Sequence, residues 1–216
     1  MVDQVLGLIP IFGAVVIGFS SLLLLISSNW RWSIVALALQ YFGALLLILI
    51  EWRIPMAATV VLAGWIACFV LFTVISSLSR GKDDSDNEQN STINMFDISS
   101  QYQPSSAFLF RLIASGVVGL AVISLVPGLT DWIPGITLEQ SLGGLILIGL
   151  GLLHLGWTAN PFRVITGLLT VLTGFEIFYS AVEISALVAG LLAVVTLGLS
   201  LVGAYMIIAP TLESIS

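Results

Sequence analysis

The sequence has very few residues of the kinds that bind metals, form disulfides or carry charge. It contains one cysteine, Cys68, and one histidine, His154, so an intrachain disulfide and haem ligation by two histidines of this chain are both excluded. No Cys/His spacing typical of a zinc site occurs. Only 8% of the residues are charged, against roughly 25% in an average soluble domain. No basic patch suited to nucleic acid is present. The sequence therefore predicts no metal and no cofactor.

Apolar residues dominate instead, at 58% of the 216 residues. Such a chain cannot cover its apolar side chains with polar surface, so its surroundings must be mostly lipid. The predicted fold class is all-α, a polytopic membrane helix bundle. Because about 20 apolar residues cross a bilayer as a helix, we expect about seven spans: 5–27, 33–50, 55–77, 108–126, 138–157, 163–184 and 186–208. A six-span alternative remains open, because only a minimal turn separates the last two.

The basic residues predict the orientation. With seven spans, one side of the membrane receives all of them except Arg53: Arg31, Arg80, Lys82, Arg111 and Arg163. The side rich in Lys and Arg is normally cytoplasmic, which puts the N-terminus outside and the C-terminus in the cytoplasm. No signal-peptide cleavage site follows the first span, so we expect it to be retained. The expected location is the plasma (inner) membrane or another energy-transducing membrane, as a multi-pass protein.

The chain divides at a polar, acidic stretch. Residues 79–107 predict a cytoplasmic linker between a three-helix unit, 1–78, and a four-helix unit, 108–216. Residues 127–135, PGLTDWIPG, predict an outer loop with Pro-Gly turns.

The two units share a weak similarity in the spacing of their charged residues. Arg31 is followed by Glu51, and Arg163 by Glu183, each twenty residues later. A parallel internal repeat is one interpretation, and the preference of charges for the membrane interface is the other.

One acidic residue lies deep inside an apolar span. Glu176 stands thirteen residues into span 163–184, near the predicted middle of the bilayer. Burying a charged carboxylate there costs about 2.5–3.5 kcal/mol on insertion scales, so the acid must be neutral, paired or turned to a wet cavity. Helical spacing places four polar residues on the same face: Thr173, Tyr179, Ser180 and Glu183. Either this face belongs to a proton relay, or Glu176 only bonds a neighbouring helix.

Other polar residues in the spans have simpler interpretations. His154 lies near a span end, where a hydrogen-bonded role between helices and a relay role are both open. Gln40 and Gln140 are interpreted as hydrogen-bonding partners between helices. The candidate relay residues are thus Glu176, Glu183, Tyr179 and His154.

The stretch around Glu176 resembles a known family. Gly174-Phe175-Glu176, followed by Ala181-Val182, resembles the second helix of the 4L/K-type small membrane subunit of NADH dehydrogenase. It also resembles the hydrogenase-4 E-type membrane subunit and homologues in antiporter complexes. The resemblance covers residues 138–208 and implies that Glu176 lies on a proton-conducting axis. Glu183 stands where the family often has Asn, and residues 187–207 lack the family's second buried acid.

These observations favour one function and leave alternatives. No phosphate-binding loop, dinucleotide fingerprint or Ser-His-acid set appears, so the chain is not predicted to be an enzyme alone. We expect a membrane subunit of a large ion-translocating complex of the complex I, hydrogenase or antiporter type. It would be a subunit of a redox-driven proton-translocating oxidoreductase, with other membrane subunits as partners, contributing a buried carboxylate to a proton or cation path. The alternatives are a structural or assembly subunit of a respiratory or photosynthetic complex, and a small self-standing transporter.

Overall fold

Seven helices make up the described part of the chain. The computed structural model describes residues 2–27, 29–49, 51–52, 54–85, 105–157 and 160–213. The helices are α1 (Val2–Ile26), α2 (Trp30–Ile48), α3 (Ile54–Ser85), α4 (Ser105–Trp132), α5 (Leu138–Gly156), α6 (Pro161–Val182) and α7 (Ala186–Glu213). Each is long and apolar enough to cross a membrane, and no strand occurs among these residues. The predicted all-α bundle of seven spans is confirmed.

Two boundaries differ from the sequence-based expectation. The six-span alternative is wrong, because three non-helical residues separate Val182 from Ala186. The predicted loop 127–135 is also wrong in part, since α4 continues through Pro127 to Trp132. Proline is tolerated inside spanning helices because their surroundings can satisfy the freed backbone groups. Of the predicted linker, residues 86–104 lie outside the described part of the chain.

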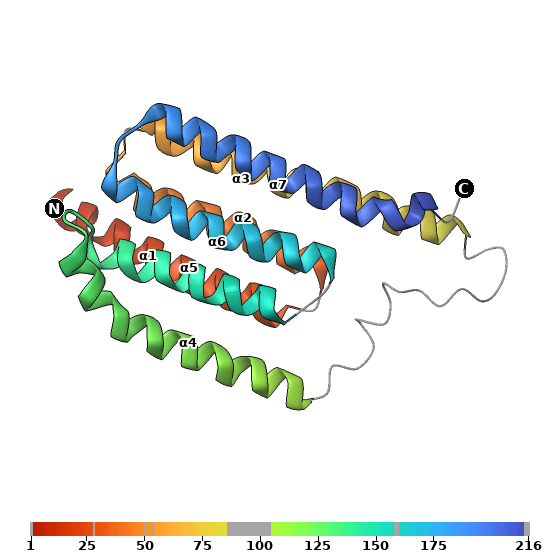
Figure 1. Ribbon diagram of the computed structural model, residues 1–216, viewed down its shortest axis with the longest axis horizontal. Coiled ribbons are helices and arrows are strands. Elements are labelled where there is room, and N and C mark those ends of the chain that lie inside the picture. The colour runs from red at the N-terminus through yellow and green to blue at the C-terminus, as the bar shows by residue number, and fades with distance from the viewer. Residues whose placement is uncertain are drawn as a thin grey trace.

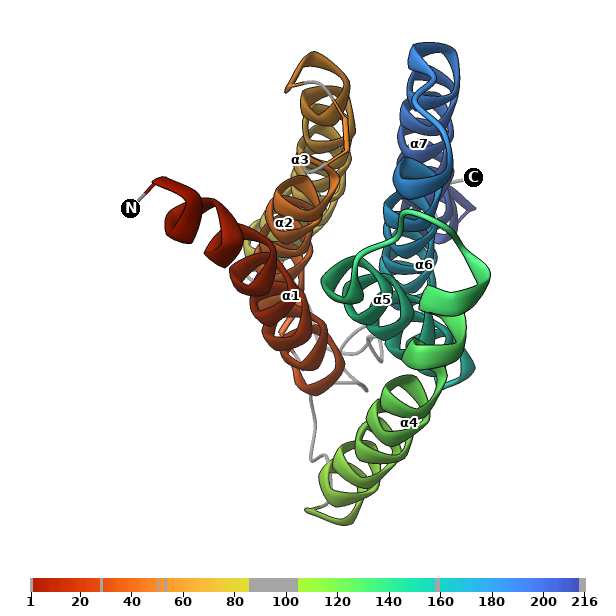
Figure 2. The same ribbon diagram turned by 90° about the vertical axis from the view of Figure 1, so that its left-hand side faces the viewer.

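The helices lie in two facing layers. Helices α1, α2 and α3 lie side by side in one layer, and α5, α6 and α7 lie side by side in the other (Figures 1 and 2). Across the layers α1 packs on α5, α2 on α6 and α3 on α7, while α4 packs mainly on α5 at the edge of the second layer. Paired helices run in the same direction (Figure 1). The arrangement is that of a parallel repeat, with α4 between the two copies.

A glycine crossing recurs in both layers. In the first, a Cβ on Gly43 of α2 would lie 3.2 Å from the carbonyl oxygen of Gly13 in α1. In the second, a Cβ on Gly174 of α6 would lie 2.8 Å from the carbonyl oxygen of Gly144 in α5. The second crossing follows the first by 131 residues at both glycines (13 to 144 and 43 to 174). Glycine lets backbones approach this closely in membrane helices, so the two layers share a packing device as well as an order of helices.

The two ends of the bundle differ in chemistry. Helices α2, α4 and α6 begin at one end, called here the arginine end, where Arg31, Arg111 and Arg163 lie. The opposite end, called the Glu183 end, carries the α2–α3 and α6–α7 connections. At that end a capping box between Thr137 and Gln140 starts α5. The Gln140 side chain also donates to the carbonyl oxygen of Leu47 in α2 at 3.2 Å, which confirms its predicted role between helices.

Candidate functional site

A polar face runs along α6 inside the bundle. Its five side chains are spaced by three or four residues and are at most 1% exposed: Thr166, Thr170, Thr173, Glu176 and Ser180. Such spacing places them on one side of a helix, and this side faces the other helices rather than lipid. Of the predicted face, Thr173, Glu176 and Ser180 are therefore buried, and the buried face extends about two turns further toward the arginine end than the sequence indicated.

Glu176 is the only acid on this face. Its Oε1 atom lies 3.3 Å from the hydroxyl oxygen of Thr196 in α7, and its Oε2 atom has no hydrogen-bond partner among the described residues. Because α6 ends at Val182, Glu176 lies about 9 Å from that end of the helix and about 22 Å from its start at Pro161. The carboxyl group thus lies within the span, in the half nearer the Glu183 end.

Two residues of α2 face the polar side of α6 from the first layer. The fully buried Tyr41 interacts electrostatically with Glu176 and lies near the hydroxyls of Thr173 and Thr196. The Tyr41 hydroxyl makes no hydrogen bond of standard geometry. Its ring packs against Gly64 of α3, where any Cβ would overlap the ring. The glycine therefore makes room for the tyrosine to reach the acid.

Gln40 lies beside Tyr41 and faces α6. Its Oε1 atom is 3.4 Å from the hydroxyl oxygen of Thr170, and its Nε2 atom has no partner among the described residues. This contact agrees with the predicted role of Gln40 between helices. Glu176, Tyr41, Gln40 and Thr196 thus come from three helices and both layers, and we call them, with Thr170 and Thr173, the central cluster.

The rim at the Glu183 end holds two of the predicted relay residues. Tyr179 donates to the Glu183 carboxylate at 3.3 Å. Trp52, from the α2–α3 connection, donates its indole N–H to the carbonyl oxygen of Glu183 at 3.1 Å. Glu183 follows the last residue of α6 and is exposed, so it does not share the buried face with Glu176. These three residues tie the two layers together at the rim.

His154 lies at the other end of α6. This buried side chain of α5 has its Nε2 atom 3.5 Å from the hydroxyl oxygen of Thr166. Arg111 and Arg163 are close enough to His154 to act on it electrostatically. Thr166 precedes Glu176 by ten residues, or about 15 Å along the helix. The structure therefore does not bring the four predicted relay residues together: one is central, two lie at the rim and one at the arginine end.

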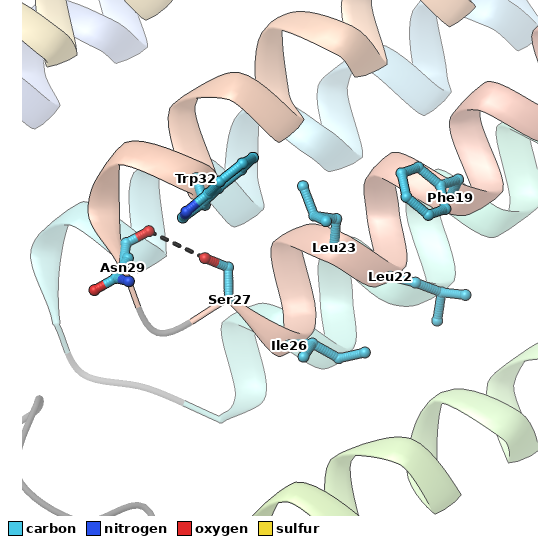
Figure 3. A pocket seen from close by; sticks show the side chains of 7 residues that line it. All are labelled: Phe19, Leu22, Leu23, Ile26, Ser27, Asn29 and Trp32. Atoms are coloured by element: carbon cyan, nitrogen blue, oxygen red, sulfur yellow. Dashed lines mark hydrogen bonds between the residues drawn. The ribbon is translucent and has the colours of Figure 1, made fainter.

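A separate depression lies on the outer face of α1 and α2 at the arginine end (Figure 3). It is lined by Phe19, Leu22, Leu23, Ile26, Ser27, Asn29 and Trp32. Within it the Ser27 hydroxyl donates to the carbonyl oxygen of Asn29 at 3.0 Å. With no charged lining residue, this depression offers no chemistry comparable to that of the central cluster.

Tyr41, Thr170 and Thr196 were not identified from the sequence. Each lies in an apolar run where many faces are equivalent, and only the packing of α2 and α7 on α6 selects them. Within the described residues, no three His, Cys, Asp or Glu side chains gather as they would around a transition metal.

The fold and the cluster define a polytopic membrane protein with a parallel helical repeat and a carboxyl group buried between its two layers. Comparison of the chain with protein-family models, with curated proteins and with solved structures finds no match. The resemblance over residues 138–208 therefore stays a hypothesis that rests on its short motif.

Proposed function

We propose that this protein provides a path for protons or another small cation across the membrane, with Glu176 as the carboxylate on that path. The observation that carries the proposal is a carboxyl group only 1% exposed, between two repeated layers, with one oxygen unpartnered among the described residues. Ionisable residues inside spans are costly and mark ion pathways and proton relays. In transporters built from repeats, ion sites lie at the interface of the repeats.

The surroundings of Glu176 supply hydrogen-bonding groups in both directions. Toward the arginine end, Thr173, Thr170 and Thr166 follow at intervals of about one helical turn, or roughly 5 Å. Toward the Glu183 end, Ser180 continues the buried face as far as the last turn of α6. Water molecules bridge polar groups separated by such intervals, so the polar face of α6 supports passage along that helix.

Membership of a larger complex is the second part of the proposal. It is supported by the resemblance of Gly174-Phe175-Glu176 to the 4L/K-type membrane subunits, whose partners carry the redox cofactors. The expected partners are other membrane subunits of an ion-translocating complex in an energy-transducing membrane.

A structural or assembly subunit is the second candidate function. One observation favours it: α7 faces Glu176 with the neutral residue Thr196, and its spanning part, Ala186–Ala209, contains no acid. On this alternative the Glu176 carboxyl group is protonated and only joins the layers.

Ion flux in membranes that contain the intact complex separates the two. We expect Glu176→Gln, which keeps shape but removes the ionisable group, to assemble normally and to lower flux several-fold. Glu176→Asp is expected to retain part of it. Flux is measured with a pH-sensitive dye in membrane vesicles, and assembly by native gel electrophoresis of the tagged chain. Glu183→Gln is the matched control at the exposed rim. Normal flux in a fully assembled Glu176→Gln complex would leave the structural candidate.

A further inference from the structure

The threonine hydroxyls around Glu176 have their hydrogens directed elsewhere. Thr173 donates to the carbonyl oxygen of Leu169 at 2.8 Å, and Thr170 to that of Thr166 at 2.8 Å, each within α6. A hydroxyl group has one hydrogen but can accept further bonds through its lone pairs. The two hydroxyl oxygens therefore face the central cluster as acceptors.

Thr196 also presents an oxygen acceptor to Glu176, because its single hydrogen is used elsewhere. Its hydroxyl oxygen lies 3.0 Å from the carbonyl oxygen of Leu192 but 3.3 Å from Oε1 of Glu176. The single hydrogen serves the shorter contact better. When Glu176 is ionised, the Thr196 and Glu176 oxygens face each other without a hydrogen between them, an arrangement that a positive charge stabilises.

Gln40 adds a further acceptor. As drawn, its Oε1 atom faces the Thr170 oxygen at 3.4 Å, although the Thr170 hydrogen is already used at 2.8 Å. Side-chain amide oxygen and nitrogen are assigned from their hydrogen bonds. Exchanging them lets Nε2 donate to Thr170 and turns Oε1 to the side where Nε2 is now unpartnered. The amide oxygen then becomes a buried acceptor beside Thr170, about 9 Å along α6 from Glu176.

We infer that the central cluster binds a single monovalent cation of the sodium kind, stripped of its water. The carboxylate of Glu176 and the hydroxyls of Thr173, Thr196 and Tyr41 supply its ligands, and Gln40 lies further along α6, against Thr170. Oxygen ligands of this kind replace the hydration shell of a hard cation. This inference rests on the proposed function and names the ion for which the site is built.

The charge of the site selects a monovalent ion. Glu176 is the only acid within the bundle, because every other acidic residue in the described ranges lies at or beyond a helix end. One carboxylate balances one positive charge, whereas a divalent ion would leave a net charge buried in a low-dielectric interior. Because ligands come from α2, α6 and α7, the ion would also join the two layers.

Direct binding of radioactive sodium to the purified chain, in nanodiscs and without its partners, tests this inference. We expect saturable binding to the wild type that excess unlabelled Na⁺ displaces and that choline at equal ionic strength does not. Glu176→Gln should abolish binding, and Thr196→Val should weaken it by roughly tenfold to a hundredfold, as losses around metal sites do. Thr59→Val removes the same group from the exposed face of α3 and should bind like the wild type.

Two results would overturn the inference: no saturable sodium binding by folded wild-type protein, or equal binding by Glu176→Gln. Circular dichroism verifies the fold of each variant, and the choline comparison in the wild type does not depend on any variant folding. If sodium does not bind but proton flux still depends on Glu176, the proposed function stands and the ion is a proton. If flux is also independent of Glu176, both proposals fall.

Discussion

The two layers of this protein share a scaffold but not a chemistry. Each has three helices in the same order and a glycine crossing between its first two helices. The Arg–Glu pairs align the two layers in sequence at a spacing of 132 residues (31 to 163 and 51 to 183). This spacing differs by one residue from that of the glycines. In this register Tyr41 corresponds to Thr173, and the buried Ala44 to Glu176. The comparison shows that a repeat can keep its packing while only one copy carries a buried carboxyl group.

The largest effect that the comparison predicts concerns the side of the membrane on which equivalent connections lie, because labelling of a cysteine from one side is all or none. In a protein whose buried Cys68 is replaced by serine, cysteines at Glu51 and Ile184 occupy the equivalent connections of the two layers. We expect both to react with a membrane-impermeant thiol reagent from outside, and a cysteine at Ser85 only from the cytoplasm, as the basic residues predict. Reaction of the cysteines at Glu51 and Ile184 from opposite sides would contradict the parallel repeat.

The glycine crossings should respond alike in both layers. Gly43→Val and Gly174→Val each place side-chain atoms against a neighbouring helix, with carbonyl oxygens 3.2 Å and 2.8 Å from the added Cβ. Overpacking of this kind costs about 1–3 kcal/mol. The free energy of unfolding, measured by denaturation in mixed micelles, should fall by such an amount in both variants.

Gly18→Val is the control for the crossings, since a Cβ at Gly18 meets no atom within 4 Å. It should leave stability close to that of the wild type. A loss of stability in only one of the two variants would show that the glycine crossing does not contribute equally to the stability of both layers.

The sequence predicted the spans well because the signal for a span is local. Length and apolar composition within one segment determine it, and a lone acid such as Glu176 stands out against them. The partners of that acid could not be predicted, because Tyr41 lies 135 positions earlier in the chain and only packing brings α2 against α6. The end of α4 was missed for a related reason: a proline signals a turn in water, whereas Pro127 is accommodated within a spanning helix.

The connection between the layers at the rim should have the smallest effect. Trp52→Phe keeps most of the ring packing against Tyr179 but removes the hydrogen bond to the Glu183 carbonyl oxygen. A single hydrogen bond of this kind contributes about 1 kcal/mol. The unfolding free energy should decrease by about that amount, measured as for the glycine variants. A loss as large as that of the crossings would mean that this contact between the layers contributes as much to stability as the glycine contacts within them.

The central claim is that the Glu176 carboxyl group itself holds and exchanges the transported cation. Difference infrared spectroscopy of the wild type, recorded as Na⁺ replaces choline at constant pH, observes carboxyl groups directly. We predict a change in the carboxyl stretching signals that is absent from Glu176→Gln and present in Glu183→Gln. A spectrum in which no carboxyl signal responds to Na⁺ or to a change of pH, or one whose response survives in Glu176→Gln, would contradict the account.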